Sequence, residues 1–201
     1  MVHTHNAIVS QAANGKTVVI IDSKGYADKV QSFLTTNNFN TLTRDPTKKF
    51  QKLINKTMQE CNSIIDKPQI KFLTQKKHSP PVLKAQIKLH KTGIPIRPVI
   101  NNRTAPAYKL AKHMTKILNQ HISLNDHNNM RPLCQCSNIR NIGYHKKILQ
   151  NNHTQMTQQI MSLLRVVLTQ IYFTFQQTIY QHNQGIAIGS PISSLIAEIF
   201  L

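Results

Sequence analysis

Apolar residues recur with two different periods along this chain, and the alternation between those periods is the strongest constraint on its fold. Alternating or β-branched runs predict strands, and stripes at three- and four-residue spacing predict helices. We expect strands over 17–21, 82–90 and 94–100, helices over 26–34, 50–61, 110–118 and 156–171, a hairpin over 172–180 and a last helix after Pro191. This mixture, without an internal repeat, predicts an α+β fold, for which 201 residues are sufficient.

Prolines and a loss of periodicity mark the connections between these elements. Residues 66–81 contain three prolines and are predicted to form a connector. Pro95 and Pro98 interrupt the strand over 94–100, which indicates a sheet edge or a loop. Residues 125–153 show no periodicity and are rich in Asn, His and Cys. The sequence therefore predicts no regular element in this last segment.

The chain is strongly basic, and the charge is concentrated in one stretch. Lys plus Arg number 25 and Asp plus Glu number 7, which gives a net charge of +18. Residues 67–116 contain twelve of these basic residues and no acidic residue. Such a stretch can neutralise phosphates and release counterions, so it favours a nucleic-acid partner over the alternative of a merely solvated face.

The cysteines and the apolar runs bear on the compartment. Cys61, Cys134 and Cys136 do not make a disulfide framework, which favours reduced thiols in an intracellular protein. No apolar run reaches the roughly 18 to 20 residues that cross a bilayer, and the first residues lack the order of a signal peptide. We therefore expect an intracellular protein without a membrane partner.

Two segments carry the most specific motifs. The first, over 88–99, reads KLHKTGIPIRPV. The second has YFTF at 172–175 and Tyr180, continues as QGIAIGSPISS at 184–194 and closes with AEIF at 197–200. In this order the segments resemble the reverse transcriptases of retroelements, most closely the Penelope-like group. The likeness extends to VIID at 19–22, Tyr26, DPT at 45–47, Phe50 and 106–112.

The resemblance implies the fingers and part of the palm of a right-hand polymerase, with the thumb absent. It divides the chain into an N-terminal region over 1–79 and a partial reverse transcriptase domain over 80–201, which is cut off at Leu201 and aberrant over 125–148. The family copies RNA into DNA with Mg²⁺. The implied partners are thus an RNA template, a DNA primer and a deoxynucleoside triphosphate, and the implied location is the nucleus.

One candidate site lies in the first segment. A triphosphate is well matched by a guanidinium, which presents a planar fork of donors. By the resemblance, Arg97 corresponds to the fingers arginine that contacts the incoming nucleotide, with Lys88 and Lys91 as helpers. Without the second segment, Arg97 would be interpreted as an ordinary loop arginine.

The second candidate site is the loop formed by Gln184, Gly185, Gly189, Ser190 and Pro191, which matches the family's loop at the nascent base pair. Glycines permit a close backbone approach, and a helix that follows offers free N–H groups. Ser190 is predicted as the N-cap and Pro191 as the first helical residue, a pattern also typical of any capped helix.

Two further expectations concern apolar side chains near this loop. The final helix is expected to expose Leu195, Ile199 and Phe200, because its sheet partners are missing from the sequence. Tyr172, Phe173 and Phe175 are expected in the core rather than as platforms for bases.

The carboxylates of a two-metal polymerase are missing from the expected places. The family supplies one from a strand between the two segments and a pair from a later Tyr-x-Asp-Asp turn, and the sequence stops at Leu201 before such a turn. Between Arg97 and Gln184 the only acid is Asp126. Asp22 precedes the fingers arginine, which is the wrong order for a catalytic aspartate. We therefore predict no catalytic residue, no metal ligand and no polymerase activity.

The aperiodic segment has a specific hypothesis attached to it. Codons for Arg131–Asn138 can be chosen so that a reading one base later gives Asp-Leu-Tyr-Val-Asn-Val-Pro, which resembles the family's catalytic strand. We therefore predict that about 130–146 are a frame-shifted reading of that strand. The same hypothesis argues against a zinc site formed by Cys134, Cys136 and His145. Two cysteines separated by one residue are in any case a weak signal for zinc.

Two alternatives to a degenerate reverse transcriptase stay open at this point. The first is a non-catalytic, basic nucleic-acid-binding protein that uses only the stretch over 67–116. The second is an open reading frame that yields no stable protein.

Overall fold

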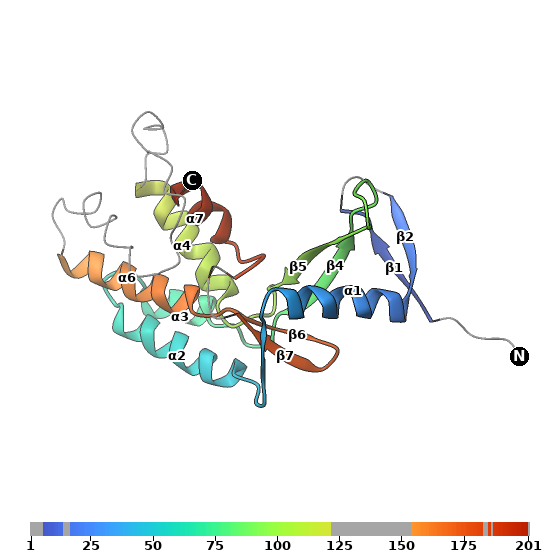
Figure 1. The fold of residues 1–201 in the computed structure, drawn as a ribbon. Coiled ribbons are helices and arrows are strands. Elements are labelled where there is room, and N and C mark those ends of the chain that lie inside the picture. Colours follow the sequence, from blue (N-terminus) through green and yellow to red (C-terminus); the bar gives the residue numbers. More distant parts are fainter. Residues whose placement is uncertain (1–5, 14–16, 122–153, 183–184, 186, 201) are drawn as a thin grey trace, which may run out of the picture.

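The computed structural model describes residues 6–13, 17–121, 154–182, 185 and 187–200. Within these residues six helices and two sheets form, which confirms the predicted α+β class (Figure 1). The elements are β1 (Ala7–Gln11), β2 (Val18–Asp22), α1 (Ser23–Thr36), β3 (Asn40–Leu42), α2 (Thr47–Glu60), α3 (Lys67–Leu73), β4 (Val82–Ile87), β5 (Ile96–Asn101), α4 (Tyr108–His121), α6 (Thr154–Leu168), β6 (Tyr172–Phe175), β7 (Thr178–Gln181) and α7 (Ser193–Phe200).

The larger sheet has the strand order β3-β7-β6-β4-β5. Strand β4 runs parallel to β6, and the other neighbours in this sheet are antiparallel. Strand β5 lies at the edge, one of the two positions that Pro95 before it and Pro98 within it predicted. The hairpin predicted over 172–180 is confirmed, with Gln176 and Gln177 at positive φ in its two-residue turn.

The molecule has two apolar clusters, one in the helices and one on the sheet. At one end in Figure 1, α2, α3, α4, α6 and α7 pack around a helical cluster that includes Ile54, Met114 and Leu163. At the other end, α1 covers β4 and β5, and Val30, Leu83 and Phe173 belong to a sheet cluster. The smaller sheet, β1–β2, packs one face against this sheet cluster through Ile8, Val19 and Ile21.

Acidic side chains begin several of the helices. The Asp22 carboxylate accepts a hydrogen bond from the Gly25 N–H at 2.9 Å and caps α1. Asp45 accepts the Thr47 N–H at 2.8 Å at the start of α2. Asp66 and Gln69 form a reciprocal capping box at α3. These carboxylates therefore have a structural role at helix N-termini.

Some local predictions were wrong. The predicted connector over 66–81 contains α3, because the Asp66 capping box and a proline in the first turn favour a helix. Ser190 is not an N-cap, since 190–193 form a turn in which the Ser193 N–H donates to the Ser190 carbonyl, and α7 begins at Ser193. Leu195 and Ile199 are buried in the helical cluster, whereas the sequence predicted them exposed. The buried side chain of Phe173 confirms a core role there.

Strands β1 and β3 were not predicted. Both are short, and β3 contains only three residues, so neither shows a clear alternation in the sequence. In the part of the chain that the structure describes, no helix is both long and apolar enough to cross a membrane.

Candidate functional site

The first candidate segment forms the tip of the β4–β5 hairpin. The strands pair from Val82 with Asn101 to Ile87 with Ile96, and the Lys88 N–H donates to the Pro95 carbonyl at 2.9 Å beyond the last pair. Gly93 turns the chain at φ +75°. The Lys29 ammonium, from α1, donates to the Gly93 and Ile94 carbonyls at 3.2 and 3.1 Å. The tip that carries Lys88 and Lys91 is thus held against α1.

Arg97 lies on the exposed face of β5, where it pairs with Gln86 next to the last pair of the hairpin. The burial pattern alternates along β5, with Arg97 facing solvent and Ile100 facing the core. The Arg97 Nη1 donates to the Ala13 carbonyl at 3.0 Å, so part of the guanidinium ties the hairpin to the end of β1. Arg97 therefore combines an exposed position with an anchored guanidinium.

The second candidate segment packs on the opposite end of the same strand. The Asn102 side-chain amide donates to the Ile188 carbonyl at 2.9 Å and to the Ile100 carbonyl at 3.3 Å. Gly189 has φ +75°, and a Cβ built on it would lie 2.4 Å from the Ile100 oxygen. Only glycine therefore permits this contact without a backbone shift. The two segments, far apart in sequence, meet through β5.

A cavity of about 250 Å³ lies beside this contact. Its walls come from the end of α1, the segment before β3, β6 with the residue before it, the end of β5, and the loop after β7. Aromatic rings and amides share the lining, which is composed of Phe33, Asn37, Phe39, Ile100, Asn102, Ile171, Tyr172, Phe173, His182, Gly185, Ala187 and Ile188. Apolar side chains with a few polar groups are the usual lining of a small-molecule pocket.

The predicted site residues are not all brought together. Gly185 lines the cavity, whereas Lys88, Lys91, Arg97, Gly189, Ser190 and Pro191 are not lining residues. Arg97 is three residues from Ile100 along β5, or roughly 10 Å at the rise of a strand. Gln184 lies outside the described residues, as do Asp126, Cys134, Cys136 and the whole segment 130–146. The structure therefore places the arginine and the glycine loop on one strand but at different ends of it.

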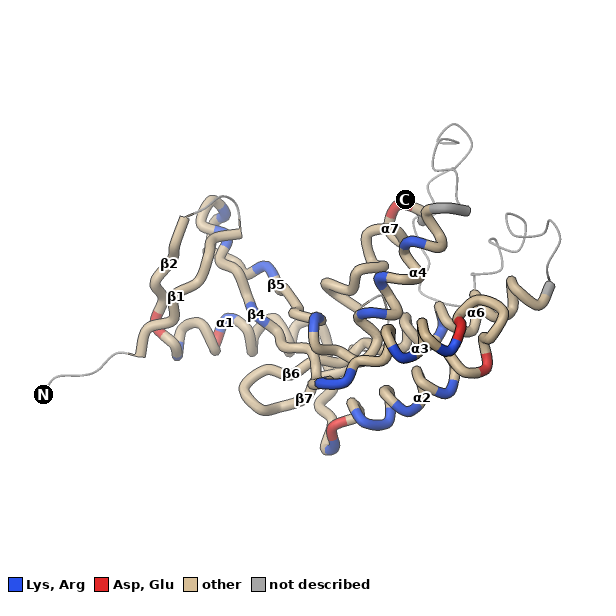
Figure 2. Tube along the Cα trace, turned by 180° about the vertical axis from the view of Figure 1, so that it is seen from behind, with Lys and Arg blue, Asp and Glu red and all other residues tan. Residues whose placement is uncertain are grey.

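The basic residues of the stretch 67–116 lie on the β4–β5 hairpin and at the helical end of the molecule (Figure 2). Within 67–116, four belong to the β4–β5 hairpin and its tip, namely Lys84, Lys88, Lys91 and Arg97. The others lie on α3, α4 and the segments next to them. The positive surface therefore extends well beyond the hairpin, over the helical end of the molecule.

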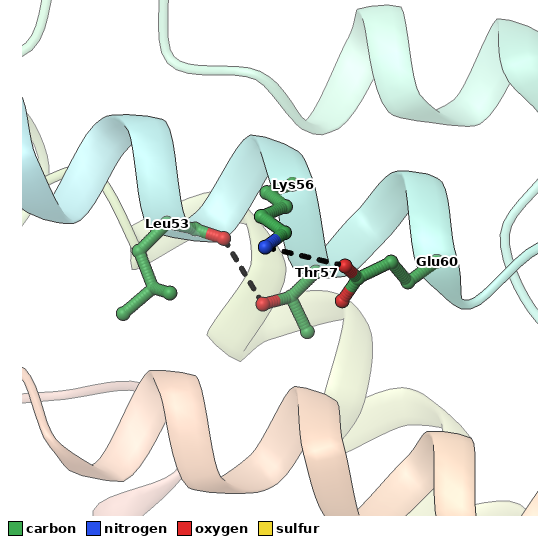
Figure 3. A network of polar contacts seen from close by, with 4 residues as sticks. All are labelled: Leu53, Lys56, Thr57 and Glu60. Carbon is green, nitrogen blue, oxygen red and sulfur yellow. Dashed lines mark hydrogen bonds and ion pairs between the residues drawn. The ribbon is translucent and has the colours of Figure 1, made fainter.

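A further row of lysines lies on α2, outside the stretch that the sequence singled out. Lys48, Lys52 and Lys56 are exposed at four-residue spacing. Lys56 pairs with Glu60 at 3.8 Å, and both side chains are mostly exposed (Figure 3). In the same turn the Thr57 hydroxyl donates to the Leu53 carbonyl at 3.0 Å. An exposed pair of this kind contributes little to stability, so this row remains a solvated basic face.

Three titratable groups are shifted by their surroundings. Burial, and then the nearby Lys116, lower the pKa of His113 on α4, whose Nε2 is buried without a hydrogen-bond partner among the described residues. Burial raises the pKa of Tyr172 to about 12, although its hydroxyl donates to Thr47 at 2.9 Å. Burial, and then Glu60, raise the pKa of the Cys61 thiol, which is a buried free cysteine. None of these three is an exposed, activated nucleophile.

Mg²⁺ prefers clustered carboxylate oxygens. Among the described residues, no three His, Cys, Asp or Glu side chains lie close enough together to hold a metal ion. Asp22, Asp45 and Asp66 begin helices, and Glu60 pairs with Lys56. The described carboxylates therefore do not fit a two-metal site, and no chemical step is derived through Mg²⁺.

Sequence reasoning missed two residues that organise the site. Lys29 holds the hairpin tip, and Asn102 joins β5 to the glycine loop. Neither belongs to either motif segment, since a lysine on an exposed helix face and an asparagine after a strand are common in any protein. Comparison with known proteins adds no identification: no family model, no curated protein and no solved structure matches this chain.

Proposed function

We propose that this chain derives from a retroelement reverse transcriptase and retains two parts of its nucleotide site on a basic body that binds nucleic acid. The two parts are the β4–β5 hairpin with Arg97 and the loop over 185–191. The parent reaction is Mg²⁺-dependent synthesis of DNA on an RNA template from a DNA primer, with deoxynucleoside triphosphates as substrates, in the nucleus. The chain itself is proposed to bind these partners without catalysing synthesis.

One observation supports the proposal more than any other. The segments that resemble the family are separated by more than seventy residues in the sequence, yet Gly189 and Ile188 of the second pack on Ile100 and Asn102, directly after the end of the first. A chance likeness at two unrelated places gives no reason for such a contact. The cavity beside the contact offers rings and amides to a planar base.

The second candidate function is a non-catalytic nucleic-acid-binding protein with no use for nucleotides. It is favoured by the basic residues that lie on the helical end, away from the hairpin. This function predicts a steep loss of RNA or DNA affinity with salt and no effect of added nucleotide. The two functions therefore differ in whether a deoxynucleoside triphosphate binds at all.

The experiment is a titration of a fluorescent deoxynucleoside triphosphate against the full chain, with and without an RNA template annealed to a DNA primer. Arg97→Ala is expected to weaken nucleotide binding by about tenfold or more, because charge-assisted hydrogen bonds to phosphate are lost. Arg97→Lys should recover part of that loss, since it keeps the charge but not the fork. Arg44→Ala removes another exposed arginine and serves as the matched control.

Each outcome distinguishes the candidates. Nucleotide binding that depends on Arg97 and not on Arg44 supports the polymerase-derived site. If Arg97→Ala and Arg44→Ala cause equal, small losses of nucleic-acid affinity and nothing else, the non-catalytic nucleic-acid-binding protein is supported. Magnesium-dependent extension of the primer by the purified chain would contradict the expected lack of catalysis.

A further inference from the structure

An exposed aromatic ring lies within the basic surface of the helical end. Phe72, on α3, is 73% exposed, although the next residue, Leu73, is buried in the helical cluster. The anchored Leu73 fixes the backbone, and Phe72 consequently points toward solvent. No other phenylalanine whose burial the structure describes is exposed. The ring is therefore accessible to a ligand rather than packed in the helical cluster.

A lysine from the neighbouring helix fixes the surroundings of this ring. The Lys109 ammonium, from α4, lies over the Phe72 ring at 5.5 Å from its centroid. The same ammonium donates to the Phe72 carbonyl at 3.0 Å and to the Thr74 carbonyl at 3.4 Å. One face of the ring is therefore next to a cation held in place by the backbone, and the ring remains open to a second planar group.

Further lysines continue from this point along α4. Lys109, Lys112 and Lys116 follow at three- and four-residue spacing, which places them on one face of the helix. At 1.5 Å per residue the row is roughly 10 Å long. Lys112 and Lys116 are exposed. Across the contact between α3 and α4, Lys71 is also exposed beside Phe72.

We propose that Phe72 is a stacking platform for a base of single-stranded nucleic acid, whose phosphates follow the row Lys109, Lys112 and Lys116. An aromatic ring beside a positive track is how proteins bind single strands without reading their sequence. Duplex is excluded from the ring because its bases are already stacked. The inference rests on the proposed function only in sharing its nucleic-acid partner, since the ring lies on α3 and the proposed nucleotide site on β5 and its neighbouring loop.

The test measures binding of labelled single-stranded RNA, single-stranded DNA, duplex DNA and an abasic DNA strand of equal length to the full chain. Phe72→Ala is expected to weaken binding of both base-bearing single strands by about tenfold, and to leave the abasic strand and the duplex unchanged. Phe72→Tyr should retain affinity. Ile20→Ala, which truncates a side chain that is 72% exposed on β2, is the matched control and should change nothing.

The lysine row is tested with a second pair of variants. Lys112→Ala combined with Lys116→Ala should weaken the binding of all strands, the abasic one included. On single strands it should reduce the magnitude of the slope of log affinity against log salt by about 1.4. Lys48→Ala combined with Lys52→Ala removes two lysines from the exposed row on α2 and should have a smaller effect. A difference between the affinities for single-stranded RNA and single-stranded DNA would identify which of the two the site prefers.

Four results would overturn the proposal. The first is that Phe72→Ala binds base-bearing strands with wild-type affinity. The second and third are that Phe72→Ala loses as much affinity for the abasic strand, or for duplex, as for base-bearing strands. The fourth is that the double lysine variant on α2 loses as much affinity as the one on α4. If nucleotide binding did not depend on Arg97, the single-strand proposal would still stand, because nucleotide affinity and strand affinity are measured separately. Thermal unfolding of each variant checks that the fold is retained.

Discussion

The two ends of the molecule bury their apolar residues to very different extents. The helical cluster draws residues from five helices, and α2 and α4 present lysines on their outer faces. The sheet end has a smaller cluster, and its β1–β2 layer leaves Val9, Val18 and Ile20 exposed on one face. The helical end therefore provides the stable body, and the sheet end provides the hairpin that carries Arg97.

The two proposed binding sites lie at different ends of the molecule. The proposed single-strand site lies on α3 and α4, within the better-packed end. The hairpin is held by Lys29 of α1 and by the bond from Arg97 to the Ala13 carbonyl just after β1, both at the sheet end of the molecule. Local stability scales with buried apolar contacts, so nucleotide binding should be lost before strand binding under mild denaturation.

The largest effect is expected from a truncation inside the helical cluster. Leu163→Ala removes a fully buried side chain and should lower the free energy of unfolding by about 2 to 5 kcal/mol. Ile20→Ala, on the exposed face of β2, should change it by less than about 0.5 kcal/mol. Urea denaturation followed by circular dichroism measures both. Similar losses for the two variants would contradict the contrast between the ends.

The next effect concerns the contact between the two motif segments. Gly189→Ala places a Cβ against the Ile100 carbonyl at positive φ and should cost about 1 to 3 kcal/mol. Gly185→Ala is the matched control, because Gly185 also has positive φ but has nothing within 4 Å of the position that a Cβ would take. The difference between the variants isolates the clash. Equal unfolding midpoints would show that the loop does not need its close approach to β5.

A smaller effect is expected at a hydrogen bond between β6 and the start of α2. Tyr172→Phe removes the hydroxyl that donates to Thr47 at 2.9 Å in a buried setting, and should cost about 1 to 2 kcal/mol. Tyr180→Phe removes a longer bond of 3.3 Å to Gln31 and should cost less. Denaturation midpoints of the two variants rank the bonds. A larger loss at Tyr180 would contradict this ranking.

The smallest effect is a pH dependence of the helical end. Because the folded state lowers the pKa of His113, the unfolded state binds a proton more readily. The contribution of His113 to stability is therefore complete above its unfolded pKa of about 6.5 and falls as the pH drops below that value. His113→Gln should reduce the change in unfolding midpoint between about pH 7.5 and about pH 5.5. If the unfolding midpoint of His113→Gln changed between these pH values as much as that of the unaltered protein, His113 would be excluded as a contributor.

Much of the fold could be predicted from the sequence because its signals are local. The stripes that became α2, α4 and α6, and the two prolines that confined β5 to an edge, act through periodicity and backbone chemistry alone. The burial of Leu195 and Ile199 could not be predicted in this way, because it depends on helices α4 and α6 meeting α7 in space. Helix α3 was not predicted, because the prolines of 66–81 indicated a connector and the capping box of Asp66 and Gln69 was not recognised.

The candidate site was predictable only in part. Motif residues such as Arg97 and Gly189 could be named from the sequence, and the close approach of Gly189 to β5 gives a physical reason for a glycine there. That the glycine loop packs at Ile100 and Asn102 rather than at Arg97 follows from tertiary contacts, which the sequence did not indicate. Lys29, Asn102 and Phe72 act through tertiary contacts with distant elements.

The proposed descent from a reverse transcriptase is tested by the coding DNA across codons 120 to 150. Descent predicts that a reading one base later over about codons 130–146 encodes an aspartate followed by Leu-Tyr-Val-Asn-like residues, as in the family's catalytic strand. Absence of an aspartate-bearing strand from every frame between the two motif segments would contradict that descent.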